Sequence, residues 1–301
     1  MSSFRRFTHA YQQSQRISFD ENSKFILFSD CHRGDMSFAD DFAKNANVYN
    51  HALRHYLTQG FTYLELGDGD ELWEHLSFRP ILEAHGVTYK ILSQFHALGR
   101  YLKIWGNHDI VWRRNNYVKK YLHSFLDKKS GELKPLLPGI HPVEAIVLQH
   151  THTGQQLFLT HGHQAEYMNA VGWKIHRFLV RVLWKPLQVW GIADPTSPAR
   201  NYLELRKVER RIKKWIVAND NILTITGHTH RPRFPEPDDI PYFNDGSCVH
   251  PRSITGIEIE NDCITLIKWH ITTTENGVLH VDRVVLEGPR ELALYGKSAM
   301  L

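Results

Sequence analysis

Short, mainly apolar runs end abruptly in polar residues at five places along the chain. Each run has the length and composition typical of a buried β-strand. The residues that follow include carboxylates, an amide and histidines, which are groups able to bind a metal ion. The runs occupy residues 25–28, 63–66, 102–105, 157–160 and 222–225. This pattern predicts five strands that each present metal-competent side chains at their carboxyl ends.

Helical periodicity separates the first three of these strands. Apolar residues recur at i, i+3 and i+4 between Tyr49 and Leu57, and Gly60 follows as a stop signal. A second helix is predicted from Ile81 to Leu98. Alternating strands and helices indicate an α/β fold, in which functional sites gather at the carboxyl ends of the strands.

The chain changes character after Pro241. In residues 255–259 and 263–267 apolar and polar positions alternate, as is typical of β-strands. We therefore expect the back half of the core to be antiparallel.

One segment, about residues 166–220, follows neither pattern. It holds 11 lysines and arginines against 5 acidic residues, so it carries a charge of +6. Two helices are predicted here, over residues 173–184 and 202–218, with a proline-containing loop between them. We interpret the segment as a helical insertion within a single domain that spans residues 1–301.

The first of these two helices has an apolar stripe and a basic stripe. The stripes consist of Ile175, Phe178, Leu179, Val182 and Leu183, and of Lys174, Arg177, Arg181 and Lys185. Such a helix suits a cap that contacts a lipid-like substrate or an anionic membrane surface. The alternative is an ordinary helix with its apolar side on the core and its cations in water.

Composition narrows the class of protein. Of 301 residues, 42% are hydrophobic and 12% aromatic, which excludes an intrinsically disordered chain. No apolar stretch approaches the roughly 20 residues of a membrane-spanning helix, and residues 1–20 lack the apolar core of a secretion signal. We therefore expect a cytoplasmic protein, with Cys31, Cys248 and Cys263 as reduced thiols. The net charge of +4 is too small to indicate nucleic-acid binding, and 20 histidines are the first sign of metal chemistry.

The polar residues at the strand ends form a candidate metal-binding set. Its members are Asp30, His32, Asp68, Asn107, His161, His228 and His230. Seven side chains are too many for one ion and suit two ions if a carboxylate such as Asp68 bridges them. The mixture of imidazole and oxygen ligands without thiolates suits Mn, Fe, Zn, Co or Ni and disfavours a structural zinc finger.

The five motifs, in this order, resemble those of the calcineurin-like metallophosphoesterases. They are Asp-x-His at 30–32, Gly-Asp at 67–68, Gly-Asn-His-Asp at 106–109, His-Gly-His at 161–163 and Gly-His-Thr-His at 227–230. The resemblance covers about residues 24–232. It implies a four-layer αββα sandwich with a dinuclear metal centre.

The resemblance also implies which residues hold each ion. One ion would take Asp30, His32, Asp68 and His230, and the other would take Asp68, Asn107, His161 and His228. Two divalent ions are expected, with Mn²⁺ as the first choice. Two such ions can activate a water molecule and hold phosphoryl oxygens, so no covalent nucleophile is needed.

His108 and Asp109 are the predicted catalytic residues. By the resemblance, His108 meets the phosphate and assists the leaving group, and its neighbour Asp109 would fix its tautomer. For each of three nearby residues, the sequence allows two interpretations. Asp70 and Glu71 either support the centre or begin a solvated helix, and Arg33 either touches phosphate or is exposed.

A narrower resemblance is to the branch that contains UDP-2,3-diacylglucosamine hydrolase. It rests on the helical insertion, on Arg231-Pro232 and on the Gly-Asp-x-x-Glu pattern at 67–71. In that enzyme the inserted helices cap the site and hold acyl chains. This chain departs from the branch at His108, where arginine is typical, and at His163, where aspartate is typical.

We expect a phosphoesterase that cleaves a phosphodiester or pyrophosphate bond in a nucleotide-linked or lipid-like substrate and that contacts an anionic membrane peripherally. The alternatives are a protein or small-molecule phosphomonoesterase, a nuclease, and a non-catalytic scaffold for partner proteins. A nuclease would need a series of base-stacking aromatic residues, which is not evident, so a nucleic-acid partner is not expected. A scaffold would be expected to have lost ligands, whereas all seven are present.

Overall fold

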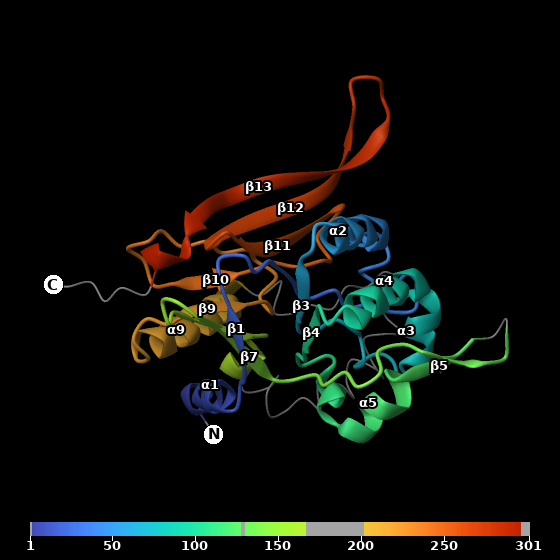
Figure 1. Ribbon diagram of the computed structural model, residues 1–301, viewed down its shortest axis with the longest axis horizontal. Helices are drawn as coiled ribbons and strands as arrows, with labels where there is room; N and C mark the ends of the chain where they lie inside the picture. Colours follow the sequence, from blue (N-terminus) through green and yellow to red (C-terminus); the bar gives the residue numbers. More distant parts are fainter. Residues whose placement is uncertain (1, 128–129, 167–201, 296–301) are drawn as a thin grey trace.

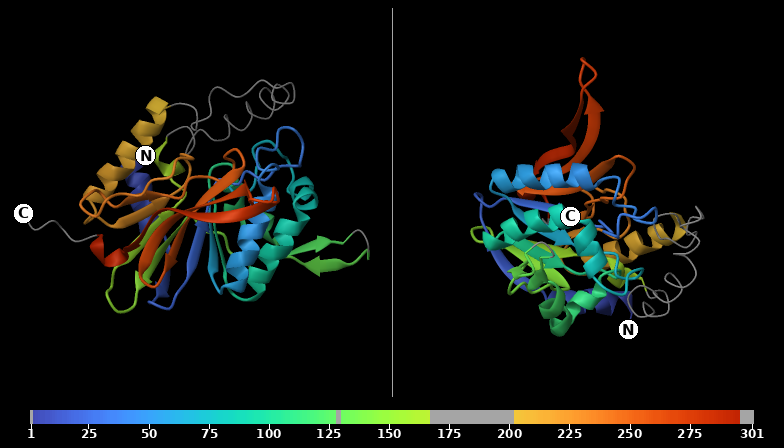
Figure 2. Two further views of the ribbon diagram at one scale, coloured as in Figure 1. Left: turned by 90° about the horizontal axis from the view of Figure 1, so that it is seen from above. Right: turned by 90° about the vertical axis from the view of Figure 1, so that its right-hand side faces the viewer.

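Two β-sheets pack face to face at the centre of the protein, and helices cover both outer faces (Figures 1 and 2). The computed structural model describes residues 2–127, 130–166 and 202–295. None of the described helices combines the length and apolarity that a membrane crossing requires.

The larger sheet has six strands in the order β13-β12-β11-β2-β3-β4. Strands β2, β3 and β4 are parallel, and β11, β12 and β13 form an antiparallel meander that joins β2 through β11. The strands are β2 (Phe25–Phe28), β3 (Thr62–Leu66), β4 (Tyr101–Ile104), β11 (Ser253–Glu260), β12 (Cys263–Thr273) and β13 (Leu279–Glu291). The expected change from parallel to antiparallel pairing is confirmed.

The smaller sheet has five strands in the order β1-β7-β8-β9-β10. Only the β7–β8 pair is antiparallel. The strands are β1 (Gln15–Phe19), β7 (Ala145–His150), β8 (Gln156–Thr160), β9 (Leu223–Thr226) and β10 (Tyr242–Asn244). A separate two-stranded ribbon contains β5 (Ser124–Leu126) and β6 (Leu133–Pro135).

Three clusters of buried hydrophobic side chains hold these elements together. Between the sheets, side chains such as Leu64 from the larger sheet and Leu159 from the smaller one form a common buried cluster. A second cluster joins the larger sheet to α2 (Ala46–Thr58), α3 (Arg79–Ala84) and α4 (Gly86–Ala97), and a third joins the smaller sheet to α1 (Ser3–Gln12) and α9 (Tyr202–Val217). The remaining helical elements are η1 (Ile110–Arg113), α5 (Asn115–Tyr121), η2 (His163–Ala165) and η4 (Leu292–Leu294). The four-layer αββα architecture is therefore confirmed.

The helix expected over residues 81–98 is divided into α3 and α4. His85, at the junction, has φ −108° and ψ 32°, which is outside the helical region. Its ring is held by the buried carboxylate of Asp40, with Nε2 and Oδ2 2.9 Å apart. This contact, between residues 45 positions apart, could not be read from the local periodicity.

The predicted insertion is described only in part. Helix α9 agrees with the helix predicted over residues 202–218. Val208, Ile212 and Trp215 of α9 are buried against the smaller sheet, so this helix forms an outer layer of the sandwich. The first predicted helix, residues 173–184, lies outside the described residues.

Asp40 organises the loop that runs from the end of β2 to α2. Its side chain accepts hydrogen bonds from the backbone N–H groups of Met36, Phe42 and Ala43, in addition to its contact with His85. Burial alone would raise the pKa of Asp40, but the hydrogen bonds from His85 and the loop outweigh burial and hold this pKa below its ordinary value. The charged carboxylate is thus the form that the folded state favours.

We expect Asp40→Asn to weaken the protein at neutral pH and to matter little in acid. Since the folded-state pKa is lowered, the contribution of Asp40 is present above about pH 4 and is lost as the pH falls through the folded-state value. Urea unfolding at pH 7 and at pH 3 measures the difference. Asp41→Asn, at an exposed neighbour, is the matched control. An equal loss of stability by Asp40→Asn at both pH values would contradict this assignment.

Candidate metal centre

Five loops from the two sheets converge at one edge of the sandwich. Three follow β2, β3 and β4 of the larger sheet and two follow β8 and β9 of the smaller one. Backbone hydrogen bonds lock the first two loops together, from Asp30 N to Gly67 O at 3.1 Å and from His32 N to Asp68 O at 2.9 Å. The carboxyl ends of neighbouring strands therefore bring the predicted ligands together, as the order of the motifs suggests.

Several predicted ligands have an uncommon backbone conformation. Positive φ angles between 49° and 69° occur at Asp30, His32, Asp68, His228 and His230. A positive φ is disfavoured for residues with a side chain and often accompanies a functional constraint. These residues follow β2, β3 and β9, where the chain turns just beyond the strand.

The side chains form two groups. The first comprises Asp30, His32 and His230, and its ligand atoms all lie within 4.8 Å of one another. Asp30 Oδ1 is 3.0 Å from His230 Nε2 and 3.7 Å from His32 Nε2.

The second group comprises Asp68, His161 and His228, with the same limit of 4.8 Å. Asp68 Oδ2 is 3.0 Å from His161 Nε2. It is also 3.9 Å from His32 Nε2, which belongs to the first group, so Asp68 lies where a bridging carboxylate would be needed. The two groups contain six of the seven predicted ligands, and the ion that each residue would hold stays a prediction from the family resemblance.

Several of the ligand atoms in these two groups, and the side-chain oxygen of Asn107, lack hydrogen-bond partners. Among the described residues, the buried atoms without one include Asp30 Oδ1, His32 Nε2, Asn107 Oδ1, His161 Nε2 and His228 Nε2. Leaving a buried polar atom unpaired costs about 1–3 kcal/mol, so such atoms require an explanation. Imidazole nitrogens and carboxylate oxygens are suitable ligands for first-row divalent ions. The residues present therefore fit a dinuclear metal centre.

The second nitrogen of three predicted histidine ligands is bonded elsewhere. His32 Nδ1 is 2.9 Å from Glu71 Oε2, His161 Nδ1 is 3.0 Å from the Leu66 carbonyl, and His230 Nδ1 is 3.4 Å from Ser247 Oγ. These contacts orient the rings and leave Nε2 for an ion, which is the usual arrangement around metal-binding histidines.

In the carboxylates of Asp30 and Asp68, one oxygen is likewise held by hydrogen bonds within the protein. Asp30 Oδ2 accepts hydrogen bonds from Ser29 Oγ and the His228 N–H, and Asp68 Oδ1 accepts one from the His108 N–H at 2.7 Å. Burial alone would raise the pKa of both, but nearby histidines outweigh burial and lower the pKa of both carboxyl groups. Each group is thus held ionised with one oxygen left for an ion.

His108 lies beside the two groups and is partly exposed. Its Nδ1 is 2.7 Å from Glu71 Oε2, and its ring stacks on Trp73 with centroids 4.1 Å apart. Trp73 Nε1 in turn donates to the carbonyl of Asn107 at 2.6 Å. These contacts fix the orientation of the ring.

The expectation that Asp109 orients His108 is wrong, because Glu71 occupies that position. Asp109 is fully buried and points away, accepting hydrogen bonds from the N–H groups of Gly106 at 2.7 Å and Gly69 at 3.1 Å. Burial, which outweighs the charge of Lys103, raises the pKa of Asp109 to about 7. Asp109 therefore joins the loops that carry Asp68 and Asn107 and is a positioning residue.

Beneath these loops lies a buried ionic network. It consists of Arg33, Glu65, Asp70, Lys103 and Asp109. Arg33 Nη2 is 2.8 Å from Glu65 Oε2, and Arg33 Nε is 3.0 Å from Asp70 Oδ1. Lys103 contacts all three acidic residues of the network. Neither interpretation of Arg33 from the sequence is correct, because its side chain is fully buried within the fold.

We expect Lys103→Met to destabilise the protein strongly. It would leave three buried carboxyl groups with Arg33 as the remaining cation of the network, and breaking a buried ion pair costs about 3–5 kcal/mol. The free energy of unfolding in urea measures the effect, with Lys90→Met on the exposed surface of α4 as control. A loss no larger than that of the control would mean that the network contributes little.

Three further residues lie near the centre, and two of them, Trp73 and Glu166, were not identified as candidates from the sequence. Trp73 supports His108, and Glu166 Oε2 lies 3.6 Å from His228 Nε2 at the second group. Asp245 accepts a hydrogen bond from Ser29 Oγ at 2.7 Å. Burial and the charge of Asp30 raise the pKa of Asp245 well above its ordinary value. Aromatic and acidic residues outside the recurring motifs give no local signal of such roles.

His163 is buried next to the second group without belonging to it. Its ring centroid is 5.6 Å from that of His161 and 5.7 Å from that of Trp105. Burial, together with the charges of His161 and His228, lowers its pKa well below the ordinary value. A neutral His163 therefore fits a supporting position behind His161.

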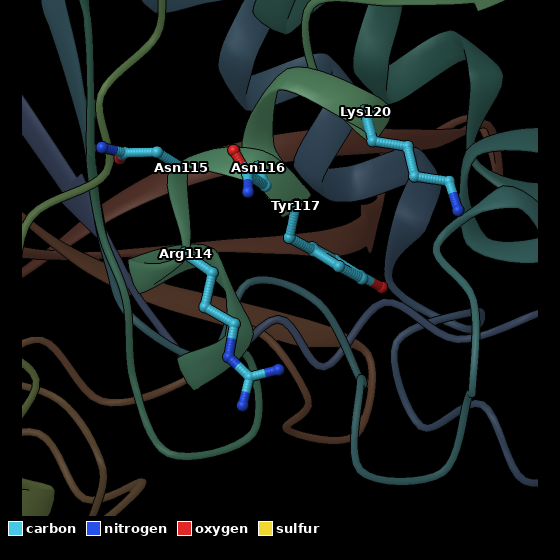
Figure 3. Close-up of a pocket in the computed structure, with 5 residues that line it drawn as sticks. All are labelled: Arg114, Asn115, Asn116, Tyr117 and Lys120. Atoms are coloured by element: carbon cyan, nitrogen blue, oxygen red, sulfur yellow. The ribbon is translucent and has the colours of Figure 1, made fainter.

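A surface cleft of about 540 Å³ lies outside the metal centre, at the start of α5 (Figure 3). It is lined by Arg114, Asn115, Asn116, Tyr117 and Lys120. Four of these five residues are exposed, and none is a predicted ligand.

No protein-family model matches the chain, and no curated protein matches it. Among solved structures, the chain is similar to vacuolar protein sorting 29 from Cryptosporidium parvum, with 15% identity over 89% of this chain and 100% of that chain and a TM-score of 0.38. A mutant cold-active protein tyrosine phosphatase has 15% identity over 91% of this chain and 83% of that chain, with a TM-score of 0.41. Vps29 from Entamoeba histolytica, complexed with zinc, has 15% identity over 88% and 99% of the two chains, with a TM-score of 0.38.

Proposed function

We propose that this chain is a dinuclear metal-dependent phosphoesterase of the calcineurin-like type. The observation that carries the proposal is the set of buried, unpaired nitrogen and oxygen atoms that face one another in two adjacent groups. Asp30, His32 and His230 would hold one ion, His161, His228 and Asn107 would hold the other, and Asp68 would bridge them. When bound, two divalent ions acidify a water molecule and neutralise charge on phosphoryl oxygens.

The chain itself supplies a proton donor at the edge of this centre. His108 is fixed through Nδ1 by Glu71, so its Nε2 is the atom that can contact a phosphoryl oxygen or protonate a leaving group. The ring cannot swing away without losing its stacking on Trp73.

The reaction that we favour is hydrolysis of a phosphodiester or a pyrophosphate bond. We propose a nucleotide-linked or lipid-like substrate and a cytoplasmic protein that contacts anionic membranes peripherally. This finer part rests on the resemblance to the UDP-2,3-diacylglucosamine hydrolase branch and on the cationic segment at 166–220. We also propose that the helix predicted over residues 173–184, within this segment, caps the centre.

An activity screen with added Mn²⁺ tests the proposal. The substrates are bis-p-nitrophenyl phosphate, p-nitrophenyl phosphate, nucleoside diphosphate sugars and lipid-linked pyrophosphates. We expect hydrolysis of a diester or pyrophosphate that is abolished by a chelator and restored by Mn²⁺. Faster hydrolysis of the monoester would favour the phosphomonoesterase alternative. Metal binding without hydrolysis of any substrate would favour a scaffold.

A further inference from the structure

A second cavity, of about 350 Å³, lies between α2 and α4. It is lined by Met36, Ala46, Asn47, Asn50, Arg54, Ala84, His85, Val87 and Thr88. None of these residues is a predicted metal ligand, so the cavity is separate from the metal centre.

The lining is rich in hydrogen-bond donors and contains no acidic residue. Arg54 is exposed at this cavity, and no ion pair joins its guanidinium to a described carboxylate. Thr88 Oγ1 donates to Asn50 Oδ1 at 2.8 Å, which leaves the amide N–H groups of Asn50 for another acceptor. A cation and amide donors without a carboxylate are the features of an anion site.

His85 adds an unpaired polar atom to this lining. The residue is 2% exposed, and its Nε2 is bonded to Asp40 Oδ2 at 2.9 Å. Its Nδ1 has no hydrogen-bond partner among the described residues. Because Nε2 faces the Asp40 carboxylate, Nδ1 of the neutral ring accepts a hydrogen bond, so a water molecule or a donor group of a ligand would satisfy it rather than the oxyanion itself.

The cavity also meets the amino end of α4. Val87 and Thr88 lie in the first turn of this 12-residue helix, and His85 at its N-cap makes no side-chain capping hydrogen bond. The first N–H groups of a helix and its dipole attract negative charge. Helix geometry and side-chain chemistry therefore favour the same kind of ligand.

We propose that this cavity binds a small molecule through a phosphate or carboxylate group. Arg54 and Asn50 would contact the oxyanion, and Met36, Ala46, Ala84 and Val87 would contact an apolar part. The ligand would also restrain the loop between β2 and α2, because Met36 lines the cavity and Asp40 of that loop holds His85. The same loop carries Asp30 and His32, so the cavity is a second site on the same segment as the metal centre.

Binding of orthophosphate and of acetate to the Mn²⁺-loaded protein tests the proposal. Calorimetry and the thermal unfolding midpoint are measured for the wild type, Arg54→Gln, Asn50→Ala and the control Arg79→Gln on exposed α3. Asp68→Ala is included because orthophosphate can also bind at the metal centre.

We expect orthophosphate or acetate to bind Asp68→Ala and to raise its unfolding midpoint. Loss of a charged hydrogen-bond partner weakens binding roughly 10- to 100-fold, so Arg54→Gln should bind the same anion that much more weakly while Arg79→Gln is unchanged. A response to orthophosphate alone identifies a phosphoryl ligand, and a response to acetate identifies a carboxylate ligand. The proposal is wrong if neither anion binds Asp68→Ala, or if Arg54→Gln and Asn50→Ala both bind like the wild type.

Discussion

Asp68→Ala should release metal from both positions of the centre. Its Oδ2 lies 3.0 Å from His161 Nε2 and 3.9 Å from His32 Nε2, so one side chain serves both groups. Elemental analysis of the purified protein should fall from about two ions per chain to fewer than one, as expected for a bridging ligand. Hydrolysis of bis-p-nitrophenyl phosphate should be lost as well.

The matched control is Asp35→Ala, since Asp35 belongs to the same cluster of loops but to neither metal-competent group. It should keep both ions. Two retained ions with normal turnover in Asp68→Ala would contradict the dinuclear assignment. Retention of one ion with a measurable decrease in turnover would instead show that Asp68 binds on one side only.

His108→Ala should keep the metal ions and slow turnover. General acid assistance contributes roughly 100- to 10,000-fold, so kcat should fall by that range while elemental analysis stays at the wild-type value. The leaving group separates this role from a structural one, because an ester with an acidic phenol needs little protonation. The defect should therefore be larger for alkyl esters than for p-nitrophenyl esters.

Glu71→Gln provides a second measurement of the same assignment. Glu71 contacts both His108 Nδ1 and His32 Nδ1, so the substitution should lower turnover and also weaken metal binding. In the double variant the effects on turnover should be less than additive, because the two residues act as a unit. Loss of metal in His108→Ala would show that His108 is a ligand.

The strand-end motifs made the candidate centre predictable from the sequence. Each strand is short and mainly apolar, and the residues just beyond it have side chains suited to metals, so the chain order alone indicates where they meet. The partner of His108 was not predictable in the same way. Asp109 is adjacent in sequence but points into the fold, whereas Glu71 comes from a different loop, 37 positions away.

The burial of several charged residues could not be predicted from the local sequence either. Lys103 and Glu65 occupy positions in β4 and β3 that look like ordinary solvent-facing alternations, and Arg33 follows a predicted ligand. Their burial depends on pairing across strands, with Arg33 Nη2 2.8 Å from Glu65 Oε2. Periodicity reports how polar a position is, but not whether a distant opposite charge allows it to be buried.

The turn between β12 and β13 is a suitable position for inserting foreign sequence. Its tip projects away from the sandwich (Figure 1), and residues 273–280 are all exposed. Backbone hydrogen bonds from Thr274 N to Val278 O and from Gly277 N to Thr274 O close the turn without help from the core. Exposed turns of this kind tolerate inserted sequence. An affinity peptide placed between Asn276 and Gly277 should thus attach the protein to a surface through a turn that contains none of the candidate metal ligands.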